Sequence, residues 1–357
     1  MLYCYGLRTS ESAAAPGPTP AKSEHQFERV FATYSISRPA RQTVIVNRTG
    51  ARIGRVGLAI ASLHRGPENP PYRYLWQMWN LPNLRQARPH QMRMDLQLER
   101  KRALITGSTA GIGFSIAEAL AKEGATVIVN GRSKQRVDDA VNRLKRVNCG
   151  GKVEGLAADL AKAEGAREAI ERYPEVEILV NNLGIFEPKA FEQIPDEDWF
   201  RFFETNVVSG VRLSRHYLPS MKQRNWGRIV FISSESALQI PAEMIHYGMT
   251  KTAQLAISRG LAETTMGTNV TVNCVLPGPT ASEGVDTFLS QMAAERKTDR
   301  STLEREFFRS VRPTSLLQRF ETTEEIASVV AFVCSPRSSA INGAALRAEG
   351  GLVRAIP

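Results

Sequence analysis

The chain has 357 residues and a formal net charge of +10, which by itself would suggest a nucleic-acid or membrane-surface partner. The excess charge is confined to residues 1–93, where 13 basic side chains face four acidic ones, whereas residues 94–357 carry 33 basic and 32 acidic side chains. The longer segment is therefore nearly neutral. We expect neither a nucleic-acid nor a membrane partner, and its size suits one α/β domain with a substantial core.

Cysteine spacing and hydropathy exclude two further classes of protein. The four cysteines stand far apart and form no C-x-x-C pair, so the sequence predicts neither a disulfide framework nor a metal site. No apolar run approaches the roughly 18 residues that a membrane-spanning helix needs. Both observations favour a reducing compartment, and we expect the protein in the cytoplasm.

Residues 1–93 hold nine of the 19 prolines and show little helical or strand periodicity. Three interpretations remain open: an Arg-rich targeting peptide, a basic tail whose aromatic side chains stack on nucleic-acid bases, or sequence upstream of a true start at Met92 or Met94. We favour the last, because domain-like sequence begins directly at Met94. Disorder is expected in each case, since this composition buries too little apolar surface to offset chain entropy.

A glycine-rich turn follows the first predicted strand, Arg102 to Thr106, and leads into a predicted helix from Phe114 to Glu123. A strand, a glycine turn and a helix in this order form the setting of a dinucleotide-binding site, because glycines let the backbone approach the pyrophosphate and the helix N-terminus offers amide donors. The candidate cofactor contacts in this turn are Gly107, Ser108, Thr109, Gly111, Ile112 and Gly113.

The second predicted strand, Thr126 to Asn130, is followed by Gly131, Arg132 and Ser133. An NAD-specific site usually places a carboxylate here to bind the ribose 2′-hydroxyl. This chain has none, and Arg132 with Ser133 suits a 2′-phosphate instead. The sequence therefore predicts NADP as the cofactor, with NAD as a possible alternative.

Three residues further along the chain point to proton transfer. The predicted strand Arg228 to Ser233 ends at Ser234, at the sheet edge where ligands bind in open α/β folds. Tyr247 and Lys251 are four residues apart, so on the helix predicted there they share one face. An ammonium beside a phenol lowers the pKa of the phenol, which would make Tyr247 a proton donor and acceptor near neutral pH.

Six landmarks occur in one order along residues 94–357: Thr106-Gly107-x-x-x-Gly111-x-Gly113, Asn181-Asn182-Leu183-Gly184, Asn206, Ser234, Tyr247-x-x-x-Lys251 and Pro277-Gly278. This arrangement resembles the short-chain dehydrogenase/reductase family, particularly its 3-oxoacyl-acyl-carrier-protein reductases. The resemblance implies a doubly wound Rossmann α/β fold, with a mostly parallel seven-stranded sheet and helices on both faces. It also implies a homo-oligomer, either a dimer or a tetramer. Departures from the family pattern are Leu183, Ser282 and Ala110.

The resemblance also implies a role for each site residue. Ser234 would bind the carbonyl oxygen, Tyr247 would protonate it, and Lys251 would lower the pKa of Tyr247 and hold the nicotinamide ribose. Asn206, within a long predicted helix from Pro195 to Arg224, would kink that helix and hold a water linked to Lys251. The remaining implied cofactor contacts are Asp159, Leu160, Asn182, Gly184, Pro277, Gly278, Thr280 and Ser282.

A long polar stretch, Ala281 to Phe320, is predicted to form a substrate lid. Its arginines suit either an anionic or phosphopantetheine-borne substrate or ordinary solvated helix faces: Arg305, Arg309, Arg312 and Arg319. We therefore expect an NAD(P)(H)-dependent oxidoreductase that interconverts a small-molecule carbonyl and a secondary alcohol, reducing a ketone or 3-oxoacyl group. The alternatives are an NAD-linked alcohol or sugar dehydrogenase and a non-catalytic NADP(H)-sensing regulator.

Overall fold

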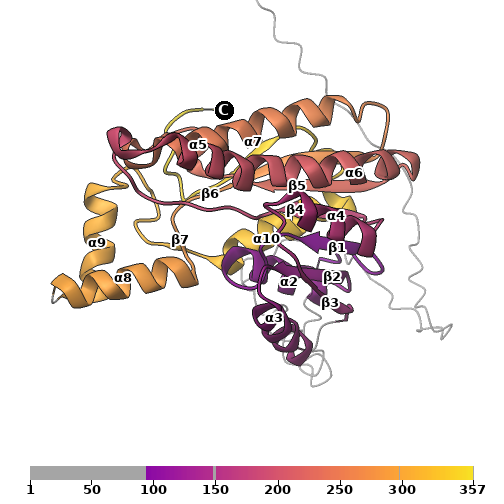
Figure 1. The fold of residues 1–357 in the computed structure, drawn as a ribbon, viewed down its shortest axis with the longest axis horizontal. Helices are drawn as coiled ribbons and strands as arrows, with labels where there is room; N and C mark the ends of the chain where they lie inside the picture. The colour runs from indigo at the N-terminus through magenta and orange to yellow at the C-terminus, as the bar shows by residue number, and fades with distance from the viewer. Residues whose placement is uncertain (1–93, 148–149, 297, 357) are drawn as a thin grey trace, which may run out of the picture. The chain divides into compact units, whose positions relative to one another are not determined.

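The computed structural model describes residues 94–147, 150–296 and 298–356, so the predictions for residues 1–93 lie outside the described residues. Seven strands form one sheet in the order β3-β2-β1-β4-β5-β6-β9, and every neighbouring pair is parallel (Figure 1). The strands are β1 (Arg102–Ile105), β2 (Thr126–Gly131), β3 (Val153–Ala157), β4 (Ile178–Asn181), β5 (Gly227–Ile232), β6 (Val270–Pro277) and β9 (Ala345–Ala348). The predicted doubly wound fold is confirmed.

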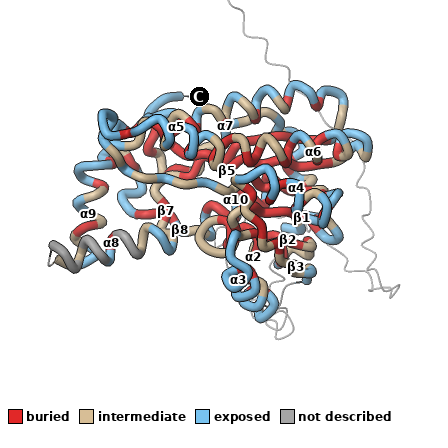
Figure 2. Tube along the Cα trace, viewed as in Figure 1, coloured by how far each residue is buried: buried red, intermediate tan, exposed pale blue. Residues whose placement is uncertain are grey.

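Helices cover both faces of this sheet, because alternate residues of each strand point to opposite sides. Leu104 of β1 packs into one hydrophobic cluster, whereas Ala103 and Ile105 pack into the other. The Leu104 side is covered by α4 (Ala163–Arg172), α6 (Ser209–Gln223) and α7 (Ile245–Glu263). The opposite side is covered by α2 (Gly111–Lys122), α3 (Lys134–Arg146) and α10 (Thr323–Cys334). Figure 2 shows the buried residues running along the sheet and the inner helix faces.

The long helix predicted from Pro195 to Arg224 is interrupted. It consists of α5 (Asp196–Phe203), a π-helical turn η2 (Glu204–Val208) and α6, in direct succession. A π-helical turn inserts extra backbone into a helix and is often found at functional sites. Asn206 lies in this turn, at the place where the family resemblance implied a kink, and the expectation of one continuous α-helix is wrong.

The predicted lid leaves the sheet after β6 and has a hydrophobic cluster of its own. Two short strands, β7 (Thr280–Ala281) and β8 (Glu321–Thr322), pair in parallel where the segment begins and ends. Between them lie α8 (Glu283–Arg296) and α9 (Arg300–Ser310), at the left of Figure 1. Buried side chains from both helices pack with the segment's last residue: Leu289, Leu303, Phe308 and Phe320.

The order of the strands determines where a ligand binds. Strand order reverses between β1 and β4, so the connections after these two strands turn away in opposite directions. In open α/β sheets the resulting crevice at the carboxyl ends receives the ligand. The glycine turn follows β1, and Asn182 to Gly184 follow β4. Among the described residues, no helix is long and apolar enough to cross a membrane.

Candidate active site

The turn between β1 and α2 contains two glycines in the left-handed backbone conformation that favours glycine. Gly107 and Gly111 have φ angles of +60° and +56°, which strain any residue with a Cβ atom. A Cβ atom on Gly113 would lie 2.5 Å from Nδ2 of Asn182 and 2.6 Å from the carbonyl oxygen of Gly107. The turn is thus compact and closely packed against the segment after β4, as a pyrophosphate cradle requires.

Two cavities follow the carboxyl edge of the sheet, and they share Asn182 and Gly184. The smaller, of about 370 Å³, contains most of the residues predicted to bind the adenosine half of a dinucleotide: Gly107, Thr109, Arg132, Ser133, Asp159 and Leu160. The larger, of about 580 Å³, contains those predicted to surround the nicotinamide and substrate: Ile112, Ser234, Tyr247, Lys251, Pro277, Gly278, Thr280 and Ser282. Their continuity and the glycine cradle fit a bound dinucleotide.

Ser108 is not brought into either cavity. Its side chain is fully buried, its hydroxyl donates to the carbonyl of Ile105 at 2.7 Å, and it accepts from the backbone N–H of Asn130 at 2.9 Å. The Ser108 hydroxyl therefore connects β1 to β2 and leaves only the residue's backbone for a ligand. Gly111 and Gly113 shape the turn without lining either cavity.

Two residues at the adenosine end were missed in the sequence. Asn130 is buried at the end of β2, where its Oδ1 accepts from the backbone N–H of Gly107 at 3.1 Å and thereby holds the glycine turn. Arg136 lines the smaller cavity beside Arg132, and its backbone N–H is capped by the Ser133 hydroxyl at 3.4 Å. The signal available in the sequence was the position of Arg136 three residues after Ser133, the serine that caps α3. Residues at this spacing lie on the same side of a helix, so Arg136 lies near the helix end that Ser133 caps.

Ser234, Tyr247 and Lys251 meet in the larger cavity. Ser234 directly follows the buried strand β5 and its run to Ser233, and Tyr247 and Lys251 lie one turn apart on α7. The Lys251 ammonium donates to the carbonyl of Ile232 at 2.8 Å and lies 5.5 Å from the centre of the Tyr247 ring. The structure therefore brings together the three groups that the sequence singled out for proton transfer.

The expected lowering of the Tyr247 pKa by Lys251 is wrong for this structure. Burial of the phenol raises its pKa above the ordinary value of 10.0, and the charge of Glu235 raises it further. The groups that lower it are Ser234, through a side-chain hydrogen bond, and Arg312, through its charge. Burial also lowers the pKa of Lys251 to about 8. Desolvation disfavours both charged forms here and is the largest contribution to each shift.

Asn206 holds the segment after β4 against α7. Its Oδ1 accepts from the backbone N–H of Ile185 at 2.8 Å, and its Nδ2 donates to the Ile185 carbonyl and the Thr250 hydroxyl, both at 3.0 Å. A Cβ atom on Gly184 would lie 3.5 Å from both Asn206 Oδ1 and Lys251 Nζ, so these two atoms flank the same glycine. Asn206 thus lies beside Lys251 without lining the cavity, and its part in a proton relay stays a prediction.

Four charged residues of the larger cavity were not assigned to the site from the sequence: Glu235, Glu243, Glu306 and Arg312. Glu235 follows Ser234 directly, and its carboxylate accepts a short hydrogen bond from the Ser234 hydroxyl. Arg312 belongs to the lid segment, and its guanidinium contacts Glu235 at 3.2 Å and Glu243 at 3.3 Å. The one signal for these residues available in the sequence was Glu235, a carboxylate in a stretch of otherwise apolar and hydroxyl-bearing residues.

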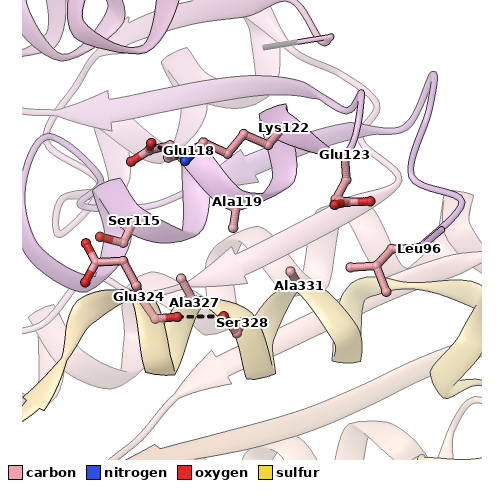
Figure 3. Close-up of a pocket in the computed structure, with 10 residues that line it drawn as sticks. All are labelled: Leu96, Ser115, Glu118, Ala119, Lys122, Glu123, Glu324, Ala327, Ser328 and Ala331. Carbon is pink, nitrogen blue, oxygen red and sulfur yellow. Dashed lines mark hydrogen bonds and ion pairs between the residues drawn. The ribbon is translucent and has the colours of Figure 1, made fainter. Parts of the chain in front are cut away.

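A third cavity, of about 300 Å³, lies between α2 and α10 and contains none of the predicted site residues. Figure 3 shows alanine side chains between the two helices, with Ser115, Glu118 and Glu324 beside them. Glu118 forms an ion pair with Lys122 at 2.5 Å, on the same helix. The arrangement is that of a surface groove between packed helices, and we assign no ligand to it.

A glycine turn at the point where strand order reverses, continuous with a cavity containing serine, tyrosine and lysine, defines a nicotinamide-dependent oxidoreductase. The family model described as short chain dehydrogenase matches residues 101–293, and the chain belongs to this family. Uncharacterized oxidoreductase YvaG of Bacillus subtilis is 52% identical over 263 residues, which cover 74% of this chain and 100% of that relative.

Two further comparisons connect the chain to named activities in other proteins. The 3-oxoacyl-[acyl-carrier-protein] reductase FabG of Aquifex aeolicus is 32% identical over 263 residues, covering 72% of this chain and 100% of the relative. Among solved structures, L-sorbose reductase from Gluconobacter frateurii, complexed with NADPH and L-sorbose, has a TM-score of 0.69 and 31% identity. That likeness covers 74% of this chain and 100% of the reductase.

Proposed function

We propose that this protein is an NADP(H)-dependent reductase that converts a neutral ketone into a secondary alcohol. The observation that carries the proposal is the meeting of Ser234, Tyr247 and Lys251 in a cavity of about 580 Å³ that continues into the dinucleotide cleft. The bound nicotinamide supplies the hydride in this chemistry. The residues of the chain orient the carbonyl and supply the proton.

Tyr247 is the proposed proton donor to the carbonyl oxygen. The Tyr247 phenol is protonated at neutral pH, which is the form needed for reduction, and its raised pKa extends this form to higher pH. The same shift makes the phenolate, the form needed to oxidise an alcohol, harder to reach. Lys251, with a pKa of about 8, can exchange a proton in the working pH range. Asn206, beside the Lys251 ammonium, is the proposed positioning residue of the relay that resupplies it.

The preference for NADP is proposed from the basic side chains at the adenosine end. Arg132 and Arg136 both line the smaller cavity, in which Asp159 is the acidic residue. No carboxylate follows β2, where an NAD-specific site would have one. Guanidinium groups form strong charge-assisted hydrogen bonds with phosphates. The NADPH in the L-sorbose reductase structure supports the same choice.

A neutral substrate is proposed from the balance of charges around the larger cavity. Of the four arginines noted in the lid segment, Arg312 lines the cavity, and it already faces Glu235 and Glu243. Glu306 lines the same space. Carboxylates facing a cavity repel an anionic substrate unless a cation compensates them. The cavity also has an apolar wall, which includes Phe186, Met244 and Phe307.

A substrate and cofactor panel tests the proposal. The purified chain is given NADPH or NADH with L-sorbose, ethyl acetoacetate, or the anionic 5-keto-D-gluconate, and loss of reduced-cofactor absorbance is followed. We expect reduction of at least one neutral ketone, a kcat/KM at least about tenfold higher with NADPH, since charge-assisted hydrogen bonds contribute about 1.5–3 kcal/mol, and little activity on the anion. Tight NADPH binding without turnover of any ketone would favour the regulator instead.

The matched variant for cofactor choice is Arg132→Ala combined with Arg136→Ala. It should lose most of the preference for NADPH while keeping turnover with NADH, because neither arginine lines the larger cavity. Arg136→Ala also removes the exposed ion pair of Arg136 with Glu283 of α8, at 3.2 Å, which contributes little in such a position. An undiminished NADPH preference in this double variant would contradict the assignment of the two arginines.

A further inference from the structure

We propose that Glu235 is a positioning residue that determines where the Ser234 hydroxyl proton points, and that Arg312 of the lid segment holds Glu235 in place. The inference deepens the proposed function, on which it rests, because it concerns how the same cavity receives ketone and alcohol. It starts from a carboxylate that lies next to the serine in sequence and in space.

Both carboxylate oxygens of Glu235 accept hydrogen bonds from neighbouring residues. The Ser234 hydroxyl donates to Oε2 of Glu235, and the backbone N–H of Ser236 donates to that oxygen at 2.8 Å and to Ser234 Oγ at 3.1 Å. The other carboxylate oxygen, Oε1, accepts from Nε of Arg312 at 3.2 Å. Glu235 is 5% exposed and Arg312 is 9% exposed, so solvent does little to screen these charges.

A serine hydroxyl carries a single proton, whereas a carboxylate can only accept. While Ser234 donates to Glu235, it presents only oxygen lone pairs to a ligand in the cavity. A ketone oxygen needs a donor, and an alcohol can itself donate. Glu235 therefore competes with a ketone for the Ser234 proton, and the arrangement seen here matches the alcohol better than the ketone.

Arg312 connects Glu235 to the lid segment, and thereby connects the competition for the Ser234 proton to the position of that segment. It follows α9, and in addition to Glu235 it contacts the Glu243 carboxylate at 3.3 Å and the Val311 carbonyl at 3.0 Å. Arg312 and Glu235 are 77 residues apart in the chain and form a buried ion pair. Loss of one partner would leave the other as an unpaired buried charge, which is strongly destabilising. Movement of the lid away from the cavity would take Arg312 with it, and Glu235 would lose the contact that orients it.

Another lid arginine provides the contrast. Arg319 forms a bidentate pair with Glu325, at 2.9 and 2.8 Å, on the exposed surface. Both pairs fasten the lid segment to another element, but only the first reaches the serine. Arg319→Gln is therefore the matched control, because it removes a lid ion pair without touching the cavity.

The test uses the full chain with Glu235→Gln, Arg312→Gln, the double variant and Arg319→Gln. The probes are ethyl acetoacetate and its alcohol, ethyl 3-hydroxybutanoate. In Glu235→Gln the amide can donate to Ser234 and release the serine proton, so the KM for the ketone relative to that for the alcohol should fall about 3- to 10-fold, the value of one hydrogen bond. Arg319→Gln should leave this ratio unchanged.

Two measurements remain decisive even if the wild-type protein turns over neither probe, which would count against the proposed function alone. The dissociation constant of the ketone in its complex with enzyme and NADP⁺, relative to that of the alcohol in its complex with enzyme and NADPH, should fall about 3- to 10-fold in Glu235→Gln. Hydrogen exchange of residues 307–312 should accelerate in Arg312→Gln and in Glu235→Gln, but not in Arg319→Gln. If a single variant fails to fold, the double variant takes its place, because it removes both charges of the buried pair.

An unchanged KM ratio in a folded Glu235→Gln protein would overturn the positioning role, as would an unchanged ratio of the two dissociation constants. Unchanged exchange in both single variants would overturn the coupling to the lid. A merely structural ion pair would lower stability and turnover in the variants without shifting the balance between ketone and alcohol.

Discussion

Substituting Gly113 with alanine would test whether the glycine turn is as closely packed as described. The added Cβ atom would lie 2.5 Å from Asn182 Nδ2, 2.6 Å from the Gly107 oxygen and 2.9 Å from the Ser108 Cα atom, two of which are backbone atoms. Overpacking of this kind costs about 1–3 kcal/mol. Asn182 cannot move freely, because its Nδ2 donates to the carbonyls of Thr106 and Gly107, both at 2.9 Å.

The net effect follows from three contributions. Weakening the two Asn182 hydrogen bonds adds about 1 kcal/mol each to the overpacking cost, while alanine in α2 recovers about 1 kcal/mol of helix propensity. We expect Gly113→Ala to lower the free energy of unfolding by about 2–4 kcal/mol, or the Tm by roughly 4–16 °C. NADPH affinity should fall at least about tenfold, because the displaced atoms form the cradle.

Gly260→Ala is the control, since Gly260 also lies in a helix but nothing lies within 4 Å of its added Cβ atom. It should stabilise the protein by about 0.5–1 kcal/mol. Urea unfolding and NADPH titration by fluorescence provide both readouts. Equal stability and equal NADPH affinity of the two variants would refute the close packing of the turn.

Four further predictions concern other parts of the chain. Tyr247→Phe should lower turnover by about 10²- to 10⁴-fold with NADPH binding nearly intact; turnover within threefold of wild type would exclude Tyr247 as the acid. Burial raises the pKa of Glu321, whose carboxylate accepts from the Gly278 N–H at 3.0 Å, from 4.5 to about 7. The folded state therefore binds this proton more tightly, so its contribution to stability is complete below about pH 4.5 and is lost as the pH rises through 7; Glu321→Gln should flatten that part of the stability profile in urea unfolding. Phe200 of α5 is 74% exposed, and the family resemblance implies a homo-oligomer; Phe200→Asp should reduce the particle size in sedimentation if this apolar side chain lies in the subunit interface, and an unchanged oligomer would place the interface elsewhere. A chain beginning at Met94 should keep wild-type kcat/KM, because both cavities are lined by later residues; loss of activity would assign residues 1–93 a catalytic role.

The parts of the site that could be predicted are those encoded over short spans of sequence. The glycine turn, and Tyr247 with Lys251 on one turn of α7, follow from spacing alone. The seven parallel strands read as apolar runs because both faces of the sheet are covered. Asn206 in a helix was recognisable only through the family resemblance, which implied an irregularity of the helix where the structure has the π-helical turn η2.

What could not be predicted depends on residues that are distant in sequence. Arg312 and Glu235 are 77 residues apart, and nothing in the spacing of the lid arginines distinguishes Arg312 from Arg319. The direction of the Tyr247 pKa shift was predicted wrongly, because a helix pattern shows the nearby lysine but not the burial of both groups. Desolvation is a property of the assembled cavity.

The two-strand pair at the base of the lid has a consequence for how members of this family can diverge. Strands β7 and β8 join the two ends of the lid segment, and the segment packs on its own apolar cluster. We therefore expect that the segment can be replaced as a unit while the nucleotide-binding sheet keeps its sequence. A transplanted segment that lacks a cation at position 312 would leave Glu235 without its partner. Grafting a new substrate preference onto this scaffold would therefore require changing the residue after the serine at the same time.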